Sequence, residues 1–215
     1  MRLTRNQNLE GIPVNKELSM TTGSTEIVAA PHARGASILR LAGIVLAGSA
    51  LVAICSRIAL PLYFTPVPLT LQPFAVLLLG LLLTPRMAAA TLATYLAEGA
   101  LGLPVFAPTA LGIGGVAHLL GPTGGYLMAY PVAAWLISVT WRRTNRGFAT
   151  AALSAATGDI VILGFGALWL AVSTHASVVA TLMMAVVPFL PGEALKIAAA
   201  AGMAASFQRL RKRAV

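Results

Sequence analysis

Long apolar runs, separated by short polar or Pro- and Gly-rich breaks, follow one another along the chain after its first 36 residues. A run of about 20 apolar residues can cross a bilayer as a helix, and shorter runs fit inside a compact bundle. We therefore predict an all-α integral membrane protein, a bundle of six transmembrane helices. The predicted spans are Ile38–Leu60, Leu69–Leu83, Met87–Leu103, Gly125–Trp141, Phe148–Val172 and a last one from about Pro191 to Phe207.

The composition agrees with this pattern. Of the 215 residues, 58% are hydrophobic and 10% are charged, and the mean hydropathy is +0.84, whereas a soluble domain carries about 25% charged residues. Residues 1–36 are polar and mix basic with acidic side chains. We interpret them as a cytoplasmic N-terminal tail, and residues 37–215 as one membrane domain.

The positions of the basic residues predict the orientation of the bundle. In a six-span arrangement, all but one of the basic residues that flank the spans fall on one side, and Arg57 alone falls on the other. Because cytoplasmic loops are enriched in Lys and Arg, both termini are predicted to be cytoplasmic. The net charge of +9 is thus explained by the bilayer, with no nucleic-acid partner. The residues on the basic side are Arg34, Arg40, Arg86, Arg142, Arg143, Arg146, Arg209, Arg211, Lys212 and Arg213.

The most informative chemistry lies in the last span, where Glu193 and Lys196 are three residues apart and share one helix face. Ionisable groups at membrane depth are costly and usually face a bundle interior or a polar cavity. In the predicted orientation Gln72, Glu98 and Tyr126 fall in the same outer half of the bundle. We therefore predict a pocket that opens to the exterior, with a few polar groups in an apolar surround.

Each of these residues also has a structural explanation. Glu193 and Lys196 could be an ion pair that only joins two helices, and Glu98 could extend to the membrane interface. Asp159, near the middle of the fifth span, is better explained as a packing residue that hydrogen-bonds a neighbouring span. Arg57 is better explained as an interfacial anchor than as a ligand-binding group.

The chain lacks sequence signals for catalysis, metal binding or ATP binding. His32, His118 and His175 are isolated, and Cys55 has no Cys or His partner nearby in sequence, so no zinc site is predicted. Neither a G-x-S-x-G motif nor a G-x-x-x-x-G-K-[ST] loop is present. We predict no enzyme activity, metal or cofactor. Uphill transport would then draw its energy from another polypeptide or from an ion gradient.

Four short segments carry a family resemblance: Pro66–Gln72, Gly102–Phe106, Leu120–Tyr126 and Pro188–Lys196. Their order and spacing, from about Leu51 to Met203, resemble the BioY family, the biotin-specific substrate-binding (S) components of energy-coupling factor (ECF) transporters. The resemblance implies a six-helix bundle that holds biotin near its exterior face. It also implies a transmembrane scaffold subunit and two ATPase subunits as partners, although some members are thought to act without a dedicated energising module.

The same resemblance suggests that small residues on the first span contact the scaffold, although they could equally pack within the protein. These residues are Ala47, Ala50 and Ala53. The family's PGD-x-x-K signature falls on Glu193 and Lys196, with Glu in place of the usual Asp, and the tyrosine of its GPTGGY loop falls on Tyr126. Ile113 and Leu127 stand where some members have asparagine and arginine. The groups that could compensate are Gln72, Glu98 and His118.

These residues lead to a binding hypothesis. Glu193 would accept hydrogen bonds from the ureido group of biotin, and Lys196 would pair with its carboxylate, although the assignment of each residue to one end of the ligand stays open. The aromatic side chains of Tyr95, Phe106 and Tyr126 would pack the ring. A Gly-rich loop with Gly112, Gly114 and Gly115 would close over it as a lid. The alternatives are another small vitamin-like solute, a membrane-embedded enzyme, and a structural assembly protein.

Overall fold

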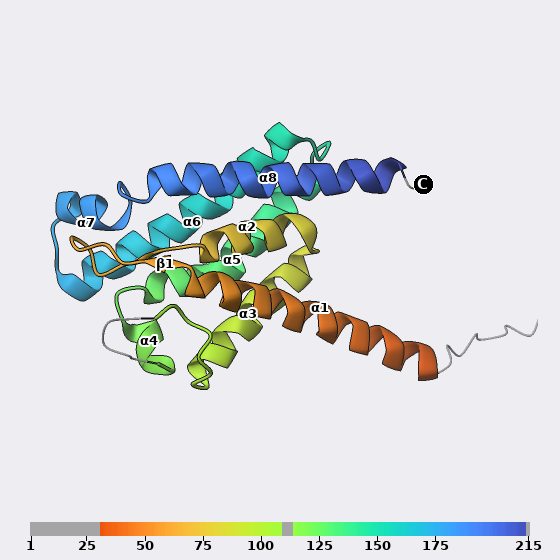
Figure 1. The fold of residues 1–215 in the computed structure, drawn as a ribbon, viewed down its shortest axis with the longest axis horizontal. Coiled ribbons are helices and arrows are strands. Elements are labelled where there is room, and N and C mark those ends of the chain that lie inside the picture. The colour runs from red at the N-terminus through yellow and green to blue at the C-terminus, as the bar shows by residue number, and fades with distance from the viewer. Residues whose placement is uncertain (1–30, 109–113, 214–215) are drawn as a thin grey trace, which may run out of the picture.

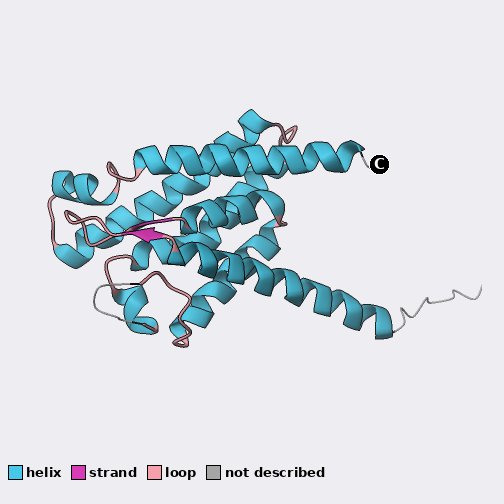
Figure 2. Cartoon of the chain, in the orientation of Figure 1, coloured by secondary structure: helices cyan, strands magenta, loops and turns pink. Residues whose placement is uncertain are grey.

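The computed structural model describes residues 31–108 and 114–213, and this part of the chain is almost entirely helical (Figure 2). Two short strands pair in an antiparallel hairpin, in the register Ala59 to Thr70 and Leu60 to Leu69. The elements are α1 Pro31–Arg57, β1 Ala59–Leu60, β2 Leu69–Thr70, α2 Gln72–Leu82, α3 Pro85–Ala100, α4 Val116–Leu120, α5 Gly124–Arg142, α6 Phe148–Thr174, α7 Val178–Ala185 and α8 Leu190–Arg213.

Each of the six predicted spans corresponds to a helix, namely α1, α2, α3, α5, α6 and α8. The predicted end of the first span was wrong, because the helix ends at Arg57 and the chain enters β1. Prolines at positions 61, 66 and 68 lack the N–H groups that a helix needs. The strand pairing satisfies part of the backbone instead, and Leu71 N donates to Ile58 O at 3.0 Å. The helix also begins at Pro31, inside the predicted tail.

Among the described residues, two helical segments are by themselves long and apolar enough to cross a membrane, Ser37–Arg57 and Phe148–Thr174. A third crossing is possible if α7 and α8, which bend by 47° at their junction, count as one span. With 11 and 16 residues, α2 and α3 rise only about 16 and 24 Å, against a hydrocarbon core of about 30 Å. The six crossings therefore stay a prediction.

Helices α5 and α6 pack closely because glycines remove side chains from their contact. A Cβ atom on Gly125 would lie 2.3 Å from Trp169 Cβ, and one on Gly166 would lie 2.2 Å from the ring of Tyr126. Both distances are far shorter than a van der Waals contact. Tyr126 therefore occupies space that only a glycine on α6 leaves open.

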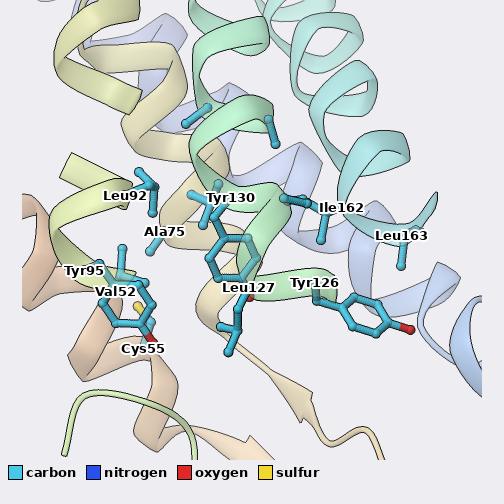
Figure 3. Close-up of a cluster of buried hydrophobic side chains, with 14 of the residues drawn as sticks. Val52, Cys55, Ala75, Leu92, Tyr95, Tyr126, Leu127, Tyr130, Ile162 and Leu163 are labelled. Carbon is cyan, nitrogen blue, oxygen red and sulfur yellow. The ribbon is translucent and has the colours of Figure 1, made fainter. Parts of the chain in front are cut away.

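Two apolar clusters fill the bundle. The first joins α1, α2, α3, α5, α6 and α7 through side chains that include Val52, Ala75, Leu92, Leu127 and Ile162 (Figure 3). The second is built around Ile137 and Trp141, near the end of α5, and packs against small residues of α8 such as Ala200 and Ala204. The first cluster supports the part of the bundle where the polar residues gather.

The two ends of the bundle differ in charge. The hairpin, α4 and α7 lie at one end, while the C-terminal end of α8 and the beginning of α1 lie at the other (Figure 1). The last turns of α5 and α8 carry arginine and lysine, and Arg142 lies close enough to Arg146 and Arg211 to interact with their charges. This basic end is opposite the first turns of α5 and α8, where Tyr126 and Glu193 lie.

Candidate functional site

A cavity lies at the end of the bundle opposite the basic cluster. Counted with its open mouth and the solvent space in it, it contains about 550 Å³ that no atom fills. The hairpin and the helices α2, α4, α5, α6 and α8 contribute to its wall. The lining residues are Val67, Pro68, Thr70, Gln72, Pro73, Ala107, His118, Thr123, Tyr126, Leu127, Tyr130, Ile162, Leu163, Phe189, Glu193 and Lys196.

Glu193 and Lys196 are the charged groups of the cavity wall, among the residues that the structure describes. Both are more than nine-tenths buried, and Lys196 Nζ donates to Glu193 Oε1 at 2.7 Å. Helix α8 begins at Leu190, with Pro191 in its first turn, where a missing N–H costs nothing. Glu193 thus lies near the positive end of the helix dipole. The predicted pairing on one helix face is confirmed, and the pair is oriented toward the cavity.

A second carboxylate, Asp159 of α6, lies beside this pair. It lies near enough to Glu193 and Lys196 to interact with their charges. Asp159 is 5% exposed and does not line the cavity. Within the described part of the chain, Asp159 Oδ1 and Glu193 Oε2 are buried without a hydrogen-bond donor. Sequence reasoning placed Asp159 in helix packing and did not connect it with Glu193.

Gln72 lies in the first turn of α2, and a hydrogen bond to Tyr95, which lies outside the cavity lining, orients its side chain in the cavity wall. Its Nε2 donates to Tyr95 Oη at 2.5 Å, and Tyr95 Oη donates to Val105 O at 3.1 Å. Thr70 Oγ1 also donates to Gln72 Oε1, at 3.2 Å. Tyr95 is fully buried on α3 and does not line the cavity. Its hydrogen bond orients Gln72, and its predicted packing against a ligand stays a prediction.

Tyr126 and Tyr130 of α5 form an aromatic part of the wall together with Phe189. Tyr126 extends from α5 toward Leu163 of α6 (Figure 3), and its Oη donates to Ala185 O at 2.7 Å. The ring centroids of Tyr126 and Phe189 are 6.4 Å apart. Tyr126 was predicted from sequence, whereas Tyr130, one helical turn later on the same face, was missed although the i, i+4 spacing pointed to it.

The short helix α4 brings His118 to the cavity. The His118 ring stacks on Phe106 with centroids 4.9 Å apart, and Phe106 in turn meets the edge of Tyr95 at 5.5 Å. Phe106 does not line the cavity itself. It contacts the His118 and Tyr95 rings from outside the cavity, and its predicted contact with a ligand stays a prediction.

Other predicted residues lie outside the cavity lining. Glu98 accepts a hydrogen bond from Ser49 of α1 and is half-buried between α1 and α3. Gly115 precedes α4 with φ of +65°, and Gly114 has open space around it. The other predicted lid glycine, Gly112, and Ile113 lie outside the described residues. On α1, Ala47 and Ala50 are exposed and Ala53 is half-buried.

No group of three His, Cys, Asp or Glu side chains that could hold a metal ion is found in residues 31–108 and 114–213. The polar groups of the cavity are instead an ion pair, amide and hydroxyl groups, and an imidazole. Such groups can bind a small organic molecule with a polar end and an anionic group, while the aromatic and aliphatic wall packs its apolar part.

Comparison with known proteins identifies the family. The sequence profile of the BioY family matches residues 27–213, nearly the whole chain. The chain belongs to the BioY family. A probable biotin transporter BioY from Pyrococcus horikoshii is 37% identical over 143 residues, which cover 66% of this chain and 82% of the relative. The biotin transporter BioY of Thermotoga maritima is 33% identical over 162 residues, covering 75% and 92% of the two chains.

A solved structure agrees with this placement in the BioY family. The crystal structure of the S-component for biotin from an ECF-type ABC transporter matches with a TM-score of 0.73 and 26% identity, covering 82% of this chain and 93% of that chain. The family and the fold are thus those of a transport component and not of an enzyme. A BioY chain with long apolar helices is a membrane protein.

Proposed function

We propose that this protein binds biotin in the cavity between α2, α5, α6 and α8 and mediates its uptake as the substrate-binding component of an ECF-type transporter. One observation carries the proposal: a buried ion pair, Glu193 and Lys196, lies in the wall of an otherwise mostly apolar cavity. The names of its BioY relatives and of the matched structure support the choice of ligand.

The chemistry of biotin suits this cavity. Lys196 is the one lysine or arginine that lines it within the described part of the chain, so it is our partner for the ligand carboxylate. Glu193 accepts from the ureido N–H groups, and Gln72 supplies a further polar contact. The fused ring packs against Tyr126, Tyr130 and Phe189, which bury apolar surface without strict directionality.

By the family resemblance, the cavity wall differs from that of some BioY members at position 127. Leu127 lines the cavity where, by the family resemblance, some members carry an arginine. The cavity therefore has an apolar surface there, and among the described lining residues Lys196 alone offers a full positive charge to the anionic end of the ligand. His118 and Thr123, whose Nε2 and Oγ1 are 3.5 Å apart, offer further polar contacts nearby.

For the membrane arrangement, we propose six crossings with both termini in the cytoplasm. The basic end of the bundle, with Arg142 and the arginines at the end of α8, then faces the cytoplasm. The cavity faces the exterior, where biotin is collected. In a bacterial or archaeal cell this corresponds to the cytoplasmic membrane.

For the partners, we propose a transmembrane scaffold subunit that works with two ATPase subunits. The exposed small residues of α1 support this assignment. Gly43, Ala47 and Ala50 form an exposed strip along α1, and a Cβ on Gly43 would meet nothing within 4 Å. Such a strip permits close approach of another membrane helix. The rest of the lipid-facing surface is apolar, with Leu39 and Ile54 more than half exposed.

The direct test is equilibrium binding of radiolabelled biotin to the purified full-length protein in detergent or nanodiscs. We expect saturable binding with one biotin per chain, displaced by unlabelled biotin and not by unrelated vitamins such as thiamine or riboflavin. Absence of saturable binding in a monodisperse preparation would contradict the proposal. Displacement by another vitamin alone would assign the cavity to that solute.

The hydrogen-bond chain behind the cavity gives a further prediction. In Tyr95→Phe the buried Gln72 Nε2 loses its acceptor, and an unsatisfied buried donor costs about 1–3 kcal/mol. Because Gln72 can then turn away from the ligand, we expect biotin affinity to fall about fivefold or more. The matched control is Tyr63→Phe, because Tyr63 is fully exposed in the hairpin loop. Equal affinities for the two variants would remove Gln72 from the binding site.

A further inference from the structure

The indole of Trp169 on α6 makes a contact that the binding scheme leaves unexplained. Its Nε1 donates a hydrogen bond of 2.9 Å to Gly121 O, 48 residues earlier in the chain, in the turn that joins α4 to α5. The same carbonyl accepts from Gly124 N at 3.0 Å, so both lone pairs of this oxygen are used. Trp169 is half-buried and does not line the cavity. Its hydrogen bond therefore joins α6 to the turn.

Two glycines at the start of α5 let the indole approach the turn this closely. A Cβ on Gly125 would lie 2.3 Å from Trp169 Cβ. One on Gly124 would lie 1.8 Å from Leu119 O of α4 and 3.3 Å from Trp169 Nε1. The first two distances are far shorter than a van der Waals contact. Trp169 and the two glycines therefore hold the end of α4 and the start of α5 against α6.

This turn joins cavity residues that belong to two different helices. His118 of α4 and Thr123 of the turn line the cavity, and so does Tyr126 in the first turn of α5. Tyr126 has an anchor of its own, since its Oη donates to Ala185 O at 2.7 Å. Helix α4 has only five residues, far fewer than a helix needs to be stable alone. Its position, and that of His118, therefore depends on tertiary contacts such as the Trp169 hydrogen bond.

We propose that Trp169 is a positioning residue for biotin binding, whose hydrogen bond to Gly121 O places His118 at the cavity. This inference rests on the proposed function. The His118 ring stacks on Phe106 with centroids 4.9 Å apart, but stacking alone does not fix the backbone that carries the ring. The indole N–H fixes that backbone at the C-terminal end of α4. Without it α4 can move away from α6, and His118 and Thr123 move with it while the rest of the wall stays in place.

Trp169→Phe tests the proposal, because it keeps an aromatic ring on α6 and removes the donor. We expect the affinity for radiolabelled biotin to fall about fivefold, with an unchanged elution profile of the purified protein. The matched control is Trp135→Phe, the same substitution at a tryptophan of α5 that is 44% exposed and outside the cavity lining. Its Kd should equal that of wild type. Equal Kd values for the two variants would overturn the proposal.

Double variants separate the positioning of His118 from general packing. In the His118→Ala background, Trp169→Phe should weaken binding by less than a further factor of about two, because the group that it positions is gone. In the Lys196→Met background the loss should stay about fivefold, because Lys196 belongs to α8 and is independent of α4. A full loss in the His118→Ala background would mean that Trp169 acts only through packing, and the inference would be wrong.

Hydrogen exchange followed by mass spectrometry tests the anchoring without any ligand. Amides of residues 116–123 should exchange faster in Trp169→Phe than in wild type, whereas those of α8 should exchange at the same rate. Equal exchange of residues 116–123 in the two proteins would contradict the inference. If exchange rises there but the wild-type protein does not bind biotin, the proposed ligand is wrong and the anchoring of α4 by Trp169 stands.

Discussion

Replacing Lys196 with alanine is expected to weaken biotin binding by about 30-fold or more while the protein still inserts and purifies as wild type. Truncating one partner of a buried, hydrogen-bonded charge pair costs about 2–5 kcal/mol, and tenfold in affinity corresponds to about 1.4 kcal/mol. Lys196 is the one full cation in the described cavity wall, so no neighbour replaces it for the ligand carboxylate. The measurement is the Kd for radiolabelled biotin, together with the elution profile of the purified protein.

The chain provides a matched control on the same helix. Lys212→Ala removes the same side chain from the exposed last turn of α8, far from the cavity, and should leave the Kd unchanged. Lys196→Met keeps most of the side-chain volume without the charge, so it separates loss of the ion pair from loss of packing. Wild-type affinity in both Lys196 variants would remove this residue from the binding site.

Gly166→Ala is expected to reduce biotin affinity by about tenfold and to lower thermal stability, although Gly166 does not line the cavity. The added methyl group would lie 2.2 Å from the Tyr126 ring, and overpacking of this kind costs about 1–3 kcal/mol. The ring cannot move freely, because Tyr126 Oη is held by Ala185 O at 2.7 Å. A shift of Tyr126 therefore breaks that hydrogen bond or narrows the cavity. Kd and the midpoint of thermal unfolding in detergent measure the two effects.

Gly164→Ala is the control for this variant. It makes the same substitution on the same helix, two residues earlier, where a Cβ would meet nothing within 4 Å. Its affinity and its thermal midpoint should match wild type, or the midpoint should rise slightly, because alanine favours a helix over glycine. If both variants bind biotin equally well, the close contact between α6 and Tyr126 does not control the shape of the cavity.

The sequence located the helices well, because hydrophobic runs and prolines act locally. The helix over Phe148–Thr174 begins where the apolar run begins, and α8 begins at Leu190, one residue before the proline that was expected to open it. The hairpin of β1 and β2 was missed, since two-residue strands carry no periodic signal. The number of membrane crossings is not settled by helix length alone, because α2 and α3 are shorter than the bilayer core is thick.

In the candidate site, too, some features could be predicted from the sequence and others only from the tertiary structure. Glu193 and Lys196 could be paired from the sequence because three residues along one helix fix their relative position. Asp159 could not be connected with them, since it comes near them only through the packing of α6 against α8. Tyr95 and Phe106 were predicted to pack against a ligand, and they lie behind the cavity lining. Whether a side chain lines a cavity or packs behind its wall is decided by side chains from other helices. Glu98 was expected in the pocket, and Ser49 holds it elsewhere.

By itself, the sequence determined that this protein is helical and membrane-embedded, that one end of it is basic, and that an acid and a base lie together at the other end. These properties follow from composition, periodicity and charge, which act within a helical turn or along one segment. Only the tertiary structure decided which helix faces meet, and hence that Gln72, His118, Tyr126 and Tyr130 join the ion pair around one cavity with Asp159 behind it. The physical reason is that close packing through small residues such as Gly125 and Gly166 sets the rotation and spacing of neighbouring helices, and no single segment specifies either.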